Sequence, residues 1–342
     1  MVWSSITTQL DQTITPLGKE KLVTTGSLVS SPSHKTRQLT LRKKSGLKTV
    51  QWGIYPFVIP AAALFGVFMI YPIVYSLVYS FTNWPVSGSP TWVGLANYGA
   101  VLSDPVIPHA FLNALLYMII SVPLQMILGL LAAIGLNKPV FGRGVFRLIY
   151  YVPVITSWVV VTYIFQYLFN TQYGVVNYVL LSLHIVSQPI AWLADPVLAL
   201  IVAALLGTWK GVGWAMLIFL GALQGVPDEL YEASALDGAN RWRQLRYITI
   251  PHIKSASRFV LVMLTIGAFQ VFIQIFILTA GGPANETQVP LTYMYQQAFE
   301  NLNFGFAGAL SWLIALVIIA FSILNFAVIR PDGAPASRRQ LK

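Results

Sequence analysis

Six long apolar stretches dominate this sequence and restrict its fold more than any other feature. They cover approximately residues 53–82, 109–136, 145–169, 196–224, 256–280 and 304–329. About 20 apolar residues in a helix cross the hydrocarbon core of a membrane, because a helix satisfies its own backbone hydrogen bonds there. Only 9% of the residues are charged, which is too few to cover a water-soluble fold. The sequence therefore predicts an all-α integral membrane protein with six transmembrane helices.

The basic residues between these stretches predict the orientation of the helices. Lysines and arginines number eight in 1–52, three in 137–147, five in 225–258 and four in 330–342. The connections that contain none are 83–108, 170–195 and 281–303. Basic connections stay on the cytoplasmic side of a membrane, so both termini and the two basic connections are expected in the cytoplasm. An even number of helices requires both termini on one side, in agreement with the charges.

Three regions follow from this pattern. Residues 1–52 are Ser/Thr-rich and are expected to form a poorly ordered cytoplasmic tail whose basic end meets anionic lipid headgroups. Residues 53–330 are expected to form the transmembrane domain, with a cytoplasmic loop at 225–255, and 331–342 a second cytoplasmic tail. The chain has no cysteine and its four histidines lie far apart, so no metal site is expected.

The loop at 225–255 contains residues that typically begin and end helices. Asp228 favours the positive end of a helix, and Gly238 can end that helix in the left-handed conformation. Asn240 can cap a second short helix, which Pro251 is expected to close. Two short helices around a glycine turn suit docking in a groove of another protein. A helix that rests on lipid is the alternative interpretation.

The same loop contains a spaced motif. It has Glu-Ala-Ser at 232–234, Asp-Gly-Ala at 237–239 and Ile-Thr-Ile-Pro at 248–251. This pattern resembles the EAA loop of binding-protein-dependent ABC importer permeases, with Ser234 in place of the second alanine and Ile250 in place of a leucine. In that family the loop forms a coupling helix that seats in a cleft of the ATPase subunit. The resemblance thus implies ATPase-coupling roles for Glu232, Ala233, Asp237, Gly238, Ala239 and Pro251.

Two further segments narrow the resemblance. Val93–Tyr98 lies in the first connection without basic residues, and Thr279–Pro283 with Thr287 follows the fifth apolar stretch. Both are similar to segments of the sugar-type permeases related to the maltose importer. With the EAA loop, they extend the resemblance over about residues 53–330. It implies a type I importer permease that moves a sugar or sugar-like solute by alternating access.

The resemblance also implies how such a permease is powered. The sequence has no Gly-x-x-x-x-Gly-Lys-Ser/Thr phosphate loop, so we do not expect ATP to bind to it by that device. Two separate ATPase subunits, holding ATP and magnesium, a second permease subunit and an extracytoplasmic solute-binding protein are implied as partners. The implied location is the cytoplasmic (inner) membrane. We expect no catalytic residue, cofactor or nucleic-acid partner for this chain.

Lys210 is the only charged residue deep within a predicted helix. A lysine at the bilayer centre costs about 2.5–3.5 kcal/mol, so it should face a cavity or a polar partner. In one interpretation Trp209 and Trp214 stack on sugar rings beside Gly211, while Lys210 donates to sugar hydroxyls. In the alternative, Gly207 and Gly211 form a close helix contact and Lys210 bonds a backbone carbonyl.

Polar residues on other helices are further candidates for the solute pathway. Gln270 and Gln274 are four residues apart, which predicts that they share one face of the fifth helix. Bonds between helices are the alternative role for such side chains. The candidates on the third, fifth and sixth helices are Tyr163, Gln166, Gln270, Gln274, Ser311, Ser322 and Asn325.

Two other classes of membrane protein were weighed against the permease. An ion-coupled secondary transporter usually holds carboxylates within its helices, whereas all 11 acidic residues here lie outside the predicted helices. A membrane enzyme acting on lipid would need paired carboxylates or a His/Asp cluster. Asp228 and Glu229 lie near Glu232 and Asp237, but no histidine or nucleophile accompanies them.

Overall fold

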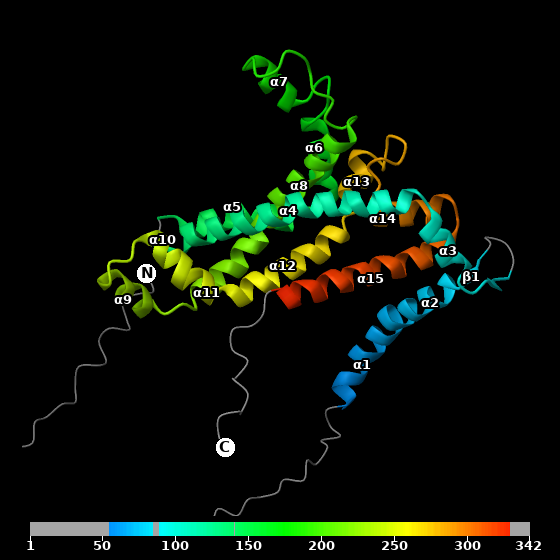
Figure 1. Cartoon of the computed structure of the whole chain (residues 1–342), viewed down its shortest axis with the longest axis horizontal. Helices are drawn as coiled ribbons and strands as arrows, with labels where there is room; N and C mark the ends of the chain where they lie inside the picture. Colours follow the sequence, from blue (N-terminus) through cyan, green and yellow to red (C-terminus); the bar gives the residue numbers. More distant parts are fainter. Residues whose placement is uncertain (1–54, 85–88, 140, 329–342) are drawn as a thin grey trace, which may run out of the picture. The chain divides into compact units, whose positions relative to one another are not determined.

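The described part of the chain is mostly helical in the computed structural model (Figure 1). The structure describes residues 55–84, 89–139 and 141–328. Apart from Tyr55 and Pro56, these residues belong to one compact unit. The two expected tails, 1–52 and 331–342, lie outside the described residues.

The elements of the first half follow in chain order, with η marking a π-helical turn. They are α1 (Tyr55–Phe65), η2 (Gly66–Ile70), α2 (Tyr71–Ser80), β1 (Thr82–Asn83), β2 (Thr91–Trp92), α3 (Ala96–Ser103), α4 (Val106–Asn137), α5 (Arg143–Ile155), α6 (Trp158–Leu168), α7 (Val175–Ser182) and α8 (Pro196–Leu223). The strands β1 and β2 form one antiparallel pair.

The second half contains the loop and the last two apolar stretches. Its elements are α9 (Asp228–Leu236), α10 (Arg241–Gln244), η3 (Leu245–Thr249), α11 (Ile250–His252), α12 (Lys254–Phe269), α13 (Ile273–Leu278), α14 (Pro290–Tyr295), η4 (Gln296–Glu300) and α15 (Phe304–Val328). Within the described residues, five helices are long and apolar enough to span a membrane, or six if α5 and α6 count as one span. The expected all-α membrane fold is confirmed.

The third apolar stretch differs from the single helix that we expected. Figure 1 shows α6 leading away from α5 toward α7, and the two helices meet at 94°. Thr156 and Ser157 between them are extended, with ψ of 152° and 132°. Pro153 lies inside the last turn of α5 and has no N–H to continue the helical bonds. The helix α5 ends at Ile155, two residues after this proline.

The fifth apolar stretch is also divided. The Gln270 N–H is shared between the carbonyls of Ile266 and Gly267, which tightens the last turn of α12. Phe272 then leaves the helical conformation, with φ −141° and ψ −66°, before α13 begins. The predicted common face of Gln270 and Gln274 is therefore wrong, because a continuous helix does not join them.

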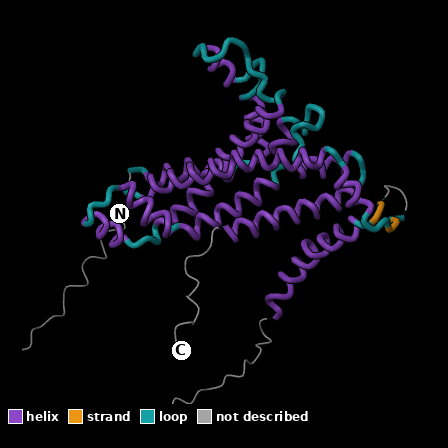
Figure 2. The backbone as a smooth tube through the Cα atoms, viewed as in Figure 1, coloured by secondary structure: helices purple, strands orange, loops and turns teal. Residues whose placement is uncertain are grey.

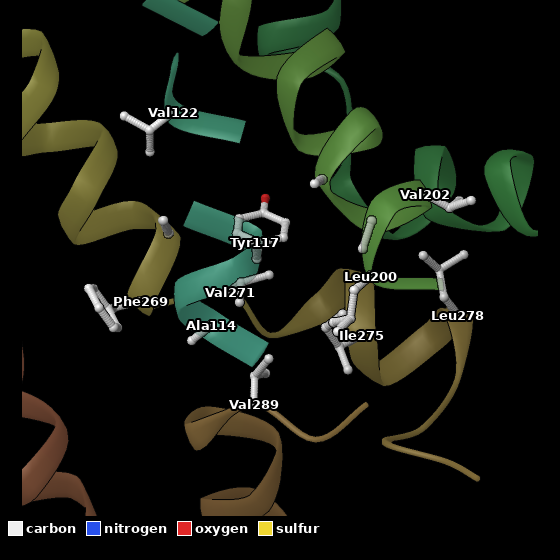
Figure 3. Close-up of a cluster of buried hydrophobic side chains, with 13 residues drawn as sticks. Ala114, Tyr117, Val122, Leu200, Val202, Phe269, Val271, Ile275, Leu278 and Val289 are labelled. Carbon is white, nitrogen blue, oxygen red and sulfur yellow. The ribbon is translucent and has the colours of Figure 1, made fainter. Parts of the chain in front are cut away.

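The core lies where α4, α8, α12 and α13 meet. The contact between α4 and α8 is the most extensive between two helices of the described chain. The long helices of the bundle are drawn in purple in Figure 2. Gly129 of α4 lies against Ala215 of α8, where a Cβ would come within 2.7 Å of the Ala215 Cβ. Small residues allow such close approach of backbones. Figure 3 shows Ala114 and Tyr117 of α4 among buried side chains of α8, α12 and α13.

The Val93–Tyr98 segment closes the end of the first span. Asn97 Nδ2 donates to the carbonyls of Ser80 and Thr82, both at 2.9 Å, at the C-terminal end of α2. The hydroxyls of Tyr98 and Ser80 are 2.8 Å apart. Because the last carbonyls of a helix have no intrahelical partner, Asn97 provides the donors that they need.

Candidate functional site

A polar cavity of about 250 Å³ lies among α4, α6, α8, α12 and α13. It is the strongest candidate for a solute site because polar side chains gather there, inside an otherwise apolar set of helices. Its polar and aromatic lining consists of Tyr117, Ser121, Gln125, Trp158, Lys210, Trp214 and Gln274.

One wall of the cavity is a stripe on α4 that the sequence analysis missed. Tyr117, Ser121 and Gln125 recur every four residues, and this spacing could have identified them. The buried Ser121 hydroxyl has no hydrogen-bond partner among the described residues. A Cβ at Gly207 would overlap the Tyr117 hydroxyl, and one at Gly211 would overlap Gln125 Oε1. The two glycines of α8 therefore make room for the polar side chains of α4.

The opposite wall contains three of the expected pathway residues. Gln274 of α13 is buried and hydrogen-bonds the Tyr117 hydroxyl. Trp214 of α8 lines the cavity, and its ring lies 6.2 Å from that of Phe259 on α12. Gly211 lies beside it, as predicted for this cluster. Aromatic faces next to amide and hydroxyl groups are the combination that polar, ring-shaped solutes need.

Lys210 is 3% exposed and has partners of its own. Its Nζ donates to the backbone oxygens of Pro153 at 2.7 Å, Val154 at 3.2 Å and Thr156 at 2.5 Å. It also lies 4.8 Å from the centre of the Trp158 ring, a cation–π contact. These contacts match the alternative interpretation of the sequence, in which Lys210 bonds backbone carbonyls. Trp158, which the sequence analysis did not single out, thereby enters the site.

Four of the other candidates lie outside this cavity and make bonds to protein. Gln166 Nε2 donates to the Ile277 carbonyl at 3.0 Å and joins α6 to α13. Asn325 Nδ2 lies 3.4 Å from Thr265 Oγ1 and joins α15 to α12. The hydroxyls of Ser311 and Ser322 donate to carbonyls of their own helix.

The remaining candidates are exposed in this chain. Tyr163 lies on α6, and Gln270 lies at the end of α12. Trp209 lines a different, larger groove of about 790 Å³ among α4, α5 and α8. That groove is lined mainly by leucines, aromatic rings and other apolar side chains, and offers little to bind a polar solute. The smaller polar cavity therefore fits a solute better than the larger groove does.

The loop between α8 and α12 is the second candidate site. As predicted, Asn240 caps α10, with its Oδ1 accepting from the Arg243 N–H at 2.9 Å. Gly238 follows α9 with φ +77°. The N–H of Gly238 bonds the Ala235 carbonyl and that of Ala239 the Ser234 carbonyl, which is a Schellman motif. The glycine turn predicted from the sequence is confirmed.

Side-chain bonds hold the two short helices of this loop together. Gln244 Nε2 donates to Ser234 Oγ at 3.0 Å and to the Tyr231 carbonyl at 3.2 Å. The hydroxyls of Tyr231 and Thr249 are 3.0 Å apart. The loop is thus one braced element and not a loose connection.

The prediction that Pro251 closes the second helix is wrong. Helical structure continues through η3 and α11, and the break falls at Ile253. Pro251 is the second residue of α11, directly after the π-helical turn η3.

A polar cavity among apolar helices, with a braced helical loop attached, defines a membrane-embedded solute permease. Residues 125–330 match the family of binding-protein-dependent transport system inner membrane components. The chain belongs to this family, which confirms the resemblance seen in the EAA loop and leaves the ion-coupled transporter without support.

Relatives match most of the chain. The lactose transport system permease protein LacF of Rhizobium radiobacter is 34% identical over 281 residues, covering 80% of this chain and 93% of LacF. YurN of Bacillus subtilis, an ABC transporter permease by name, is 33% identical over 274 residues, covering 79% of this chain and 94% of YurN.

Solved structures share the fold. A bacterial ABC transporter involved in the import of the acidic polysaccharide alginate matches with a TM-score of 0.72 and 23% identity, covering 82% of this chain and 95% of that chain. The alginate transporter in complex with its alginate pentasaccharide-bound periplasmic protein matches with a TM-score of 0.71 and 22% identity, covering 82% and 94%.

Proposed function

We propose that the chain is the permease subunit of a sugar importer and that its solute passes through the cavity between α4 and α8. The observation that carries this proposal is the cavity itself, where two tryptophans, two amides and an unpaired serine hydroxyl lie together inside a membrane-protein core. A sugar offers apolar ring faces and hydroxyl groups, which these side chains complement. LacF, the relative named for lactose transport, supports a sugar as solute.

Within the cavity, we assign solute contact to the groups that have bonding capacity left. Ser121 has a free hydroxyl, and Trp158 and Trp214 have ring faces along the lining. Gln125 and Gln274 have amide groups with several donors and acceptors each. Alternating access would expose this cavity first to one side of the membrane and then to the other.

We assign ATPase coupling to α9 and the turn that follows it. No residue of α9 is buried within the chain, and Leu236 at its end is 90% exposed. An exposed leucine on a braced helix suits burial in a groove of a partner. Glu232, Ala233, Asp237, Gly238 and Ala239 belong to this surface, and Pro251 lies in the helix against which it is braced.

The assembly proposed for this chain contains a second permease, two ATPase subunits and a solute-binding protein. The span Val58–Ser80 supports the second permease, since none of its most apolar stretch is buried within this chain. ATP and magnesium would bind to the ATPase subunits. The chain would be a multi-pass protein of the cytoplasmic membrane with both termini in the cytoplasm, as its basic residues indicate.

Reconstitution tests this proposal directly. The permease pair and its ATPase are placed in liposomes with the solute-binding protein, and labelled lactose uptake is measured with and without ATP. Uptake that requires ATP, and that falls in Ser121→Ala and Trp214→Ala, is the expected result. Uptake driven by an ion gradient without ATP would refute it.

A further inference from the structure

The break between α5 and α6 lies at the middle of the bundle and needs an explanation. The last carbonyls of α5 have no backbone N–H partners ahead of them, because Thr156 and Ser157 are extended. Inside a membrane protein no bulk water is present to satisfy such groups. The Thr156 hydroxyl donates to the Pro153 carbonyl at 2.6 Å, and the other oxygens at the break need donors from another part of the chain.

We propose that Lys210 is a positioning residue that holds this break open and fixes Trp158 in the wall of the cavity. It would control sugar binding without touching the sugar. The inference rests on the proposed function for its effect on transport, but its structural part stands without it.

The hydrogen bonds of Lys210 account for all its donors. An ammonium group has three N–H bonds, and three backbone oxygens, those of Pro153, Val154 and Thr156, lie within 3.2 Å of Nζ. Three backbone acceptors around one nitrogen match the three N–H bonds of an ammonium group, and the Thr156 hydroxyl lies further away at 3.5 Å. No N–H bond is left over for a sugar hydroxyl.

The position of the charge also suits the end of a helix. The C-terminal end of α5 is the negative end of its dipole, where a cation is favourable. The carbonyl partners belong to residues 54 to 57 positions before Lys210 in the chain. Lys210 therefore ties α8 to the third span at the break itself.

Trp158 links this contact to the cavity. It is the first residue of α6, and its ring lies 4.8 Å from the Lys210 ammonium. The same ring lines the cavity that we assign to the sugar. Loss of the ammonium would free both the start of α6 and the ring, so the wall of the site would lose its shape.

Spin labels can report the bend because the chain has no native cysteine. Val145 on α5 and Ile164 on α6 are both exposed, and cysteines there place one label on each side of the break. The distance between the labels is measured by pulsed electron paramagnetic resonance in the assembled importer. Lys210→Met should shift or broaden this distance, because the Val154 and Thr156 carbonyls lose their donor and the Pro153 carbonyl keeps only the Thr156 hydroxyl. Lys210→Arg, which keeps the charge and the donors, should restore most of the original distribution.

Two controls separate this role from the alternatives. Thr208→Val removes a buried hydroxyl that bonds only Ala204 in its own helix, so the distance should not change. Trp158→Phe should weaken lactose binding while leaving the distance unchanged. If Lys210→Met does not insert, Lys210→Gln, which has fewer donors, is measured in its place.

Lactose binding to the same assembly completes the test. We expect Lys210→Met to weaken lactose binding by about tenfold. A loss of this size corresponds to one contact, the one between the sugar and the displaced Trp158 ring. Weaker binding with an unchanged label distance would mean that Lys210 contacts the sugar, and would overturn the proposal. If the unmodified importer binds no lactose, the proposed solute is wrong, and the label distance still decides the role of Lys210.

Discussion

Gly211 shows how a single residue sets the room available in the cavity. A methyl group at this position would overlap Gln125 Oε1, so Gly211→Ala must displace Gln125 or separate α4 from α8. We expect a loss of about 1–3 kcal/mol of stability, as in other overpacked cores, together with slower lactose uptake. Thermal unfolding in detergent and proteoliposome uptake measure the two effects.

Gly221→Ala is the matched control for this prediction. Gly221 lies in the same helix, and a Cβ there meets nothing within 4 Å. The stability of the Gly221→Ala variant should stay the same or rise by up to about 1 kcal/mol, because alanine has a higher helix propensity than glycine. If both alanines were equally harmful, the close approach at Gly211 would not be the cause.

Tyr293 is a residue whose ionisation should affect stability. Its hydroxyl donates to the Asp104 carboxylate at 2.7 Å, and Asp104 also accepts from the Val106 N–H at the start of α4. Burial, helped by the Asp104 carboxylate, raises the pKa of Tyr293 to about 12. In the unfolded chain the pKa of a tyrosine is about 10. The contribution of Tyr293 is therefore complete below about pH 10 and is lost as the pH rises toward 12.

Unfolding midpoints measured against pH test this expectation. The unmodified chain should be more stable than Tyr293→Phe at neutral pH, and the difference should shrink between about pH 10 and 12. Subtracting the variant removes the contribution of the other tyrosines. A difference that stays constant up to pH 12 would contradict the role of this contact.

At the scale of elements, α9 and its glycine turn form the part that we expect to transmit motion. Gly238 has φ +77°. An alanine in this left-handed conformation would lower the stability by about 1–2 kcal/mol. A Cβ there meets no atom within 4 Å, so the cost arises from the backbone alone. Gly238→Ala should tilt α9 and uncouple the ATPase, with ATP hydrolysis retained and lactose uptake reduced.

Gly225→Ala provides the comparison within the same loop, because Gly225 has no positive φ and a Cβ there makes only ordinary contact. Hydrolysis and uptake are measured together in proteoliposomes. Normal uptake in Gly238→Ala would remove the coupling role from this turn.

The whole molecule should cross the membrane with α9 and α7 on opposite sides. Leu236 at the end of α9 and Tyr178 on α7 are both exposed, and the chain has no cysteine of its own to react. A membrane-impermeant maleimide should label Leu236→Cys only from the cytoplasmic side and Tyr178→Cys only from outside. Labelling of both from one side would refute the orientation inferred from the basic residues.

Much of the molecule could be predicted from local patterns. The Asn240 cap and the Gly238 turn depend on residues within one or two turns of each other, and both were found where the sequence places them. The apolar stretches were also found as helices, but the third and the fifth are broken. The stripe of Tyr117, Ser121 and Gln125 has an equally local signal, and its four-residue spacing could have been recognised. Gln274, a pathway candidate from the sequence, lines the cavity, but the break that separates it from Gln270 was not predicted.

The sequence by itself determined a membrane fold of apolar helices and the starts and ends of the short helices in the loop. Apolar stretches can be recognised from composition alone, and helix caps and turns depend on only a few neighbouring residues. Only the tertiary structure decided where the third stretch bends, which polar side chains meet in the cavity and what Lys210 binds. Those features depend on groups more than 50 positions apart that share no spacing. Their arrangement follows from how α4, α5 and α8 pack, and no short pattern in the chain records it.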